Sequence, residues 1–266
     1  MTAEKRQSRI FSALDAHHAI VAEDYDAAMT VLIGSQNYDL DMENSDYDTF
    51  TFVVPSLKDI AQLKEPVSTT VDGPFGHINI KDIRLALNQL KKTNPNIVEC
   101  FSFKYALVSG VYQAELSGLK NPFVLRCNTQ HMMNAIGGMA QQLSKRNMPP
   151  GKRFSHILRM RCMIRNYFDV GSDLLSLQEE ERALALQAKL DKDNPKWEKM
   201  IESCAADIKE EISKADLWYF DDRSDMAKEL IDNIQYKLLL KKYCEKEGRL
   251  AAPLLRVQTS PRPGNI

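Results

Sequence analysis

The sequence lacks long apolar runs, cysteine motifs and a marked net charge. No apolar run in its 266 residues approaches the roughly 18 needed to span a bilayer, and the N-terminal residues show no signal-peptide core, so we expect a cytosolic protein without a membrane partner. The cysteines are odd in number, scattered and without a C-x-x-C pair, which argues against a disulfide framework or a zinc site. We expect mostly buried, reduced thiols at Cys100, Cys127, Cys162, Cys204 and Cys244.

The net charge of −1 argues against a protein that binds nucleic acid over its whole surface. The charges are nevertheless unevenly placed. Residues 1–120 hold 11 Lys and Arg against 16 Asp and Glu, whereas the remaining residues hold 24 against 20. This distribution suits a site that holds a metal with one part of the chain and an anionic substrate with the other.

The hydrophobic pattern predicts an α+β fold, and 44% hydrophobic residues are enough for real cores. The first half alternates short elements, which predicts a small mixed sheet flanked by helices. We expect helices over 8–22, 56–63 (capped by Ser56), 81–93 and, after its proline, 94–103, and strands over 28–33, 45–54, 67–71 and 76–80, the last two as a hairpin.

After about residue 120 the β-branched runs nearly vanish, and the pattern predicts an α-helical second domain. Helical segments are expected over 129–146, 153–168, 176–190, 195–215 and 224–246. The predicted organisation is a mixed domain over 1–120, a helical domain over 121–250 and a flexible tail over 251–266.

One stretch, VLIGSQNYDLDMENSDYDTFTF at 31–52, carries residues suited to phosphate chemistry. If Asp46 and Asp48 lie on a strand, they project to the same face, and a divalent cation is the economical way to keep both ionised. Mg²⁺ accepts one or two carboxylates and completes its shell with water and phosphate oxygens. Gly34 and Ser35 could let the backbone approach a phosphate. Either pair alone is more typical of a solvated strand and a turn, but their combination and spacing favour a site.

Here the sequence resembles a known family. IGS followed by SDYDTF resembles the signature of the DNA polymerase beta-type nucleotidyltransferase superfamily, and GSQNY, SDYD, KDIRLAL, NPNIVE and SHILR resemble motifs of the predicted nucleotidyltransferases of bacteria and phages. The resemblance covers roughly 28–168 and implies a nucleotidyltransferase fold for residues 1–120.

The resemblance also implies a reaction. Asp46 and Asp48 would hold Mg²⁺ (or Mn²⁺), which positions a nucleoside triphosphate such as ATP and activates an attacking hydroxyl. Gly34 and Ser35 would hold the triphosphate, and pyrophosphate would leave. The acceptor is not readable from the sequence: a nucleic-acid end (RNA such as tRNA), a protein and a small molecule all stay open.

The sequence departs from the family at Asn79, where related sequences carry the third carboxylate of the catalytic set. An amide binds Mg²⁺ more weakly and cannot accept a proton as a carboxylate does. Three explanations stay open: nucleotide or RNA binding without efficient chemistry, compensation by Asp82 or His77, or deliberate replacement of an aspartate to trap a complex. Asp82 is more typical of a helix N-cap, and His77 of a hydrogen-bonded or solvated side chain.

A basic helix is the last candidate. In GKRFSHILRMRCMIRNYF, the residues Lys152, His156 and Arg159 share a helix face. Such a face could clamp a triphosphate, with Arg159 able to bind phosphate in bidentate fashion. The alternative is a solvated surface paired with acids elsewhere; the resemblance of HILR to the family's His-x-x-Arg favours binding.

Overall fold

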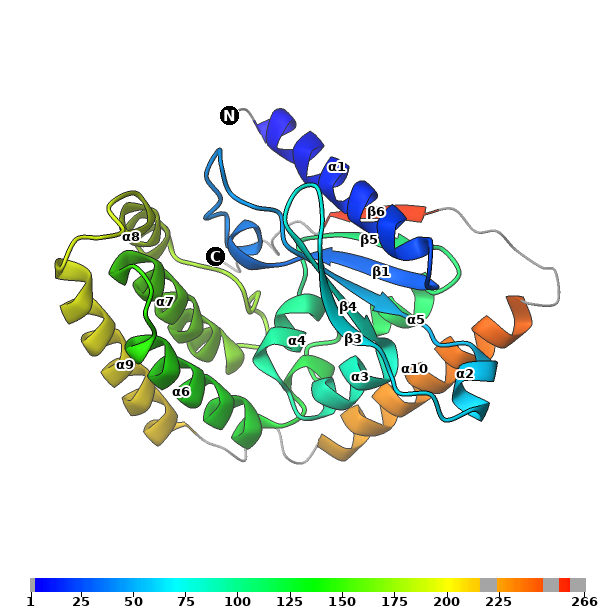
Figure 1. Cartoon of the computed structure of the whole chain (residues 1–266). Coiled ribbons are helices and arrows are strands. Elements are labelled where there is room, and N and C mark those ends of the chain that lie inside the picture. Colours follow the sequence, from blue (N-terminus) through cyan, green and yellow to red (C-terminus); the bar gives the residue numbers. More distant parts are fainter. Residues whose placement is uncertain (1–2, 216–223, 246–253, 259–266) are drawn as a thin grey trace.

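The computed structural model describes residues 3–215, 224–245 and 254–258. The fold is α+β, as predicted: a mixed sheet with helices on both faces is followed by a helical bundle (Figure 1). The strand order is β3-β4-β2-β1-β5-β6, and β2 and β4 run parallel while the other neighbours run antiparallel. The strands are β1 (Ala27–Leu32), β2 (Thr49–Val53), β3 (Ser68–Asp72), β4 (His77–Asp82), β5 (Tyr105–Ser109) and β6 (Leu254–Gln258).

Helix α1 (Ala3–Ala22) covers one face of the sheet. Its Ile10 and Leu14 form a buried cluster with Tyr47 and Tyr105. The other face packs on a larger core, to which Phe52 contributes by stacking on Phe101 at 5.0 Å between ring centroids. The helices on this side are α2 (Leu57–Ala61), α3 (Ile83–Lys91), α4 (Pro95–Phe101), α5 (Gln113–Gly118) and α10 (Ser224–Glu245).

Four helices form the bundle beside the sheet, seen at the left of Figure 1. Helix α7 packs against the other three, and the Phe154 ring of α7 stacks on the Trp197 ring of α9 at 5.2 Å. The bundle helices are α6 (Thr129–Lys145), α7 (Pro150–Tyr167), α8 (Glu179–Leu190) and α9 (Lys196–Lys214). Short 3₁₀ turns lie at η1 (Gly34–Tyr38) and η2 (Val124–Arg126).

Capping side chains fix the starts of three helices. Ser56 accepts from the N–H of Asp59, as expected, and Asp82 accepts from the N–H of Arg84 at 2.8 Å. Asp82 is therefore an N-cap, which confirms the more typical of its two readings. Asn94 caps α4, whose first residue is Pro95.

The structure corrects three expectations. Residues 45–48 lie before β2 instead of within it, so Asp46 and Asp48 are in the approach to the strand. Residues 254–258, expected in a flexible tail, form β6 and pair with β5; residues 259–266 lie outside the described residues. Helix α10, assigned to the helical part by its sequence, packs on α3, α5, α2 and η2.

None of the helices in the described ranges is both long and apolar enough to cross a membrane. The four cysteines whose side chains are described are buried and free, as expected, and Cys244 lies outside that set.

Candidate functional site

Alternation along the chain places Asp48 on the face opposite α1. Tyr47 packs under α1. On the same side, Thr49 Oγ1 shares a hydrogen bond of 2.9 Å with Nδ1 of buried His17. Asp48 and Phe50 therefore point to the other face. The parallel register pairs Phe50 with Asn79, which makes His77 the neighbour of Asp48.

The Asp48 carboxylate is held by β4. Its Oδ1 accepts the His77 N–H at 2.9 Å and lies 3.2 Å from His77 Nδ1. Gly76, with φ of 155°, allows this approach, because a Cβ there would lie 3.0 Å from Asp48 Oδ1. The second oxygen of Asp48 has no partner among the described residues.

Asp46 is exposed, and its carboxylate makes no hydrogen bond or ion pair with a described residue. Its backbone carbonyl accepts from Gln36 Nε2, which ties the D-x-D segment to η1. Asp46 lines a shallow hollow together with Asp72 and His77. No group of three or more His, Cys, Asp or Glu suited to a metal occurs in the described part of the chain. Asp48 does not line this hollow, so the two carboxylates are offered as separate ligands; Mg²⁺, which takes one or two carboxylates and completes its shell with water and phosphate oxygens, fits either of them.

A cavity of about 340 Å³ lies between the sheet and the bundle, and we call it the α4–α7 cavity. It is lined by Gly34 and Asn79 from the sheet side, Glu99 from α4, and His156 and Arg159 from α7. The remaining walls are mostly apolar: Ile33, Phe50, Pro95, Met139, Met160 and Met163, with Tyr38, Asn96 and Cys100. The structure thus brings together three of the predicted nucleotide-binding residues, Gly34, His156 and Arg159, with Asn79, whereas Asp46 and Asp48 do not line this cavity.

Arg159 is the unusual side chain of this cavity. Its Nη2 donates to His156 Nδ1 at 2.7 Å, and its guanidinium carbon lies 4.9 Å from the centre of the Tyr38 ring. Its Nε and Nη1 are buried and have no hydrogen-bond partner among the described residues. A shielded guanidinium with unsatisfied donors is a ready-made site for an anion.

The other arginines of α7 do not have this character. Arg153 pairs with Glu198, Arg161 with Asp207 at 3.0 Å, and Arg165 with Glu181. These three arginines pair with acids, whereas the predicted face of Lys152, His156 and Arg159 shows no ion pair with a described acid.

Cations gather around His156. The pKa of His156 is lowered to about 2, first by Arg159 and burial, then by Lys152, Lys189 and Arg146, so the ring is neutral. Burial and Arg159 also lower the pKa of Lys189 to about 8. Lys152 is exposed and does not line the cavity, so it contributes charge at a distance.

Gly34 and Ser35 begin η1. Gly34 has φ of 83°, a left-handed conformation that favours glycine, and it lines the cavity. Ser35 does not line the cavity, and its Oγ lies 3.4 Å from Gln36 Oε1. Asn79 lines the cavity, but both ends of its amide already make hydrogen bonds. Nδ2 donates to the Thr49 carbonyl at 3.1 Å, and Oδ1 accepts from Thr70 at 2.9 Å.

Glu99 is a cavity residue to which the sequence assigned no role. Its Oε1 accepts the Gly34 N–H at 2.9 Å. Burial raises the pKa of Glu99, while Arg159, the Gly34 N–H and Asn37 act against that rise. The acid of NPNIVE was visible in the sequence, but nothing local indicates that it meets a glycine 65 positions earlier.

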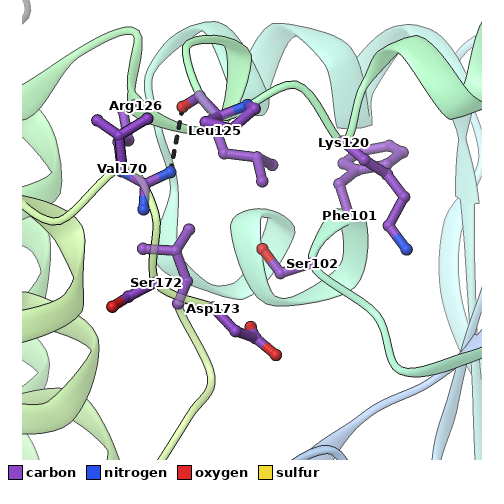
Figure 2. Close-up of a pocket in the computed structure, with 10 residues that line it drawn as sticks. Phe101, Ser102, Lys120, Leu125, Arg126, Val170, Ser172 and Asp173 are labelled. Atoms are coloured by element: carbon purple, nitrogen blue, oxygen red, sulfur yellow. Dashed lines mark hydrogen bonds between the residues drawn. The ribbon is translucent and has the colours of Figure 1, made fainter. Parts of the chain in front are cut away.

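A second cavity, of about 430 Å³, lies on the other end of α4 (Figure 2). Its wall includes Arg126, which is buried and donates to the carbonyls of Tyr167, Pro122, Asn166 and Asp169. These bonds use the N–H donors of the guanidinium, and they link η2 to the C-terminal end of α7. None of the residues predicted for the site lines this second cavity.

No model of a known protein family matches the chain, and no curated protein matches it either. The resemblance to nucleotidyltransferases therefore rests on the quoted motifs.

Proposed function

We propose that this protein is a Mg²⁺-dependent nucleotidyltransferase of the cytosol. It transfers a nucleoside monophosphate from a nucleoside triphosphate to a hydroxyl of a nucleic-acid end, a protein or a small molecule, and releases pyrophosphate. Asp46 and Asp48 are the metal ligands in this proposal, with Mn²⁺ as an alternative ion. The bound metal neutralises phosphate charge and activates the attacking hydroxyl.

The observation that carries the proposal is the guanidinium of Arg159, whose buried Nε and Nη1 have no acceptor among the described residues, in the wall of the α4–α7 cavity that Gly34 also lines. An anionic ligand would satisfy the buried Nε and Nη1 donors, which otherwise cost free energy of folding. Lys152, Lys189 and Arg146 add positive charge nearby. The apolar walls offer a surface for a base or sugar, and the volume is in the range of small-ligand sites.

The backbone of Asp48 is bonded to the end of the strand that leads into Gly34. Ile33 donates its N–H to the Asp48 carbonyl at 3.0 Å, and the next residue, Gly34, borders the cavity. Neither Asp46 nor Asp48 lines the cavity, so the proposal requires the triphosphate to extend from the cavity past Gly34 to an ion on Asp48.

The second candidate is a catalytically weak nucleotide- or RNA-binding protein on the same scaffold. Asn79 favours it, because its amide is neutral and both of its ends already bond Thr49 and Thr70. The two candidates share the binding site and differ in turnover.

Incubation with each of the four α-³²P-labelled triphosphates, Mg²⁺ or Mn²⁺, and total cellular RNA and protein tests the proposal. Labelled RNA or protein that disappears in Asp46→Ala and Asp48→Ala supports the transferase and identifies the acceptor class. Nucleotide binding without product supports the second candidate, and a gain of transfer in Asn79→Asp would strengthen that reading. Neither binding nor product, with no effect of Asp46→Ala, refutes both.

A further inference from the structure

The proposed transfer needs a group that takes the proton of the acceptor hydroxyl, and the inference below rests on that proposed function. Proton transfer to a positioned side chain is worth about 100-fold or more in rate. Asn79 cannot serve, since an amide is not a base and its oxygen already accepts from Thr70.

Most titratable groups of the α4–α7 cavity are poor proton acceptors near neutral pH. Burial raises the pKa of Tyr38 and Cys100, so both keep their protons. His156 has a pKa of about 2, and its Nδ1 accepts from Arg159, so it is a weak base. Among the cavity's described lining residues, Glu99 is the one carboxylate.

Glu99 is also well placed. The Asn94 cap and Pro95 fix the start of α4, and Glu99 follows one turn later with its Oε1 on the Gly34 N–H. It forms no ion pair within 4.0 Å with a described residue; the Gly34 N–H and Asn37 bond to it, and the charge of Arg159 favours its ionised form. The same carboxylate thus faces the cavity and touches the glycine at which we place the phosphate.

We propose that Glu99 is the catalytic base of this site. The Glu99 carboxylate takes the proton of the acceptor hydroxyl as the hydroxyl oxygen bonds to the α-phosphorus. The bond between that phosphorus and the bridging oxygen breaks, and pyrophosphate leaves with the electron pair. Glu99 then returns its proton to solvent, and no further reactant is needed.

The surroundings set the pH dependence of such a base. Arg159 and His156 face Glu99 from α7, Tyr38 faces it from η1, and Cys100 is its neighbour on α4. Of these, Arg159 carries a charge and favours the carboxylate, while burial opposes it and gives the raised pKa. Only the carboxylate accepts a proton, so turnover falls as pH falls through the pKa of Glu99.

The test is Glu99→Gln in the full-length protein. Glutamine keeps an oxygen that accepts the Gly34 N–H, so a merely structural role would survive the change. We expect kcat to fall by about 100-fold or more. The dissociation constant of a non-hydrolysable Mg²⁺–triphosphate analogue should change by less than about threefold, and the acid limb of the kcat profile should disappear. Glu202→Gln, an exposed acid of α9, is the matched control and should behave as wild type.

A second variant tests replacement. Because Asn79 and Glu99 line the same cavity, Asn79→Asp added to Glu99→Gln should raise kcat by about tenfold or more. Three results would overturn the assignment: a kcat within threefold of wild type in Glu99→Gln, a loss explained wholly by weaker nucleotide binding, or no gain in the double variant. If wild type itself neither binds triphosphate nor makes product, the proposed function fails; if wild type and Glu99→Gln are equally active, only the base assignment fails.

Discussion

Arg159 donates from Nη2 to Nδ1 of His156 across 2.7 Å, while its Nε and Nη1 have no hydrogen-bond partner among the described residues. The bond requires a lone pair on Nδ1, so His156 is neutral beside a permanent cation. The histidine orients the guanidinium without neutralising it. A pre-oriented cation with free donors at a cavity wall is suited to an anion, because little side-chain entropy is left to lose on binding.

The first prediction concerns this guanidinium. Arg159→Gln should weaken binding of a Mg²⁺–triphosphate analogue by about 30-fold, the equivalent of roughly 2 kcal/mol for a charge-assisted hydrogen bond. Arg161→Gln is the matched control, since Arg161 on the same helix pairs with Asp207 and Glu181. Isothermal titration calorimetry measures both. Equal losses in the two variants would mean that general positive charge, and not Arg159, binds the ligand.

The second prediction concerns stability against pH. The pKa of His156 is about 2 in the folded protein, well below its ordinary value, so the unfolded chain binds more protons below about pH 6.5. The contribution of this residue to the free energy of unfolding therefore decreases as pH falls. Between pH 7 and 5, wild type should lose about 1–2 kcal/mol more than His156→Gln. Urea unfolding at several pH values measures the difference, and parallel curves would contradict a depressed pKa.

The third prediction compares two glycines of the bundle. A Cβ on Gly151, in the first turn of α7, would lie 2.0 Å from the Ala188 carbonyl oxygen and 2.8 Å from Lys192 Cα. Gly151→Ala should push α7 from α8 and cost about 2 kcal/mol. A Cβ on Gly138, within α6, meets no atom within 4 Å, so Gly138→Ala should stabilise by about 0.5–1 kcal/mol. Thermal unfolding midpoints should move in opposite directions; a fall in both would refute the account of Gly138.

Local signals were sufficient to predict most helices and the hairpin. Ser56, Asp82 and the Asn94–Pro95 pair cap helices through their own neighbours, and the bundle helices repeat apolar residues at helical spacing. Strand β5, YALVS, was missed because a five-residue apolar run carries little periodicity. Strand β6 forms by pairing with β5, about 150 positions earlier, and such a long-range partner leaves no local trace.

The site was predictable as a set of residue types but not as a geometry. The D-x-D pair was expected on a strand, yet β2 begins at Thr49 and the Asp48 carboxylate is held by His77 of β4. Helical spacing correctly placed His156 beside Arg159. The contact of Glu99 with Gly34 and the unpaired state of Arg159 depend on how α4 and α7 pack, which the sequence does not encode locally.

The last prediction concerns the second cavity. The guanidinium of Arg126 is buried, donates to the Tyr167 carbonyl at 2.6 Å, and donates to three further carbonyls (Figure 2 shows one of the bonds of Arg126 as a dashed line). Arg126→Met keeps the apolar volume but leaves these carbonyls without their donor, so the free energy of unfolding should fall by about 3 kcal/mol or more. Lys199→Met, at an exposed position of α9, should stay within about 0.5 kcal/mol of wild type. Urea unfolding followed by circular dichroism measures both changes. Because Arg126 lies outside the α4–α7 cavity, the triphosphate affinity of Arg126→Met under native conditions should equal that of wild type. A loss of affinity in this variant would show that the two cavities are coupled through α4.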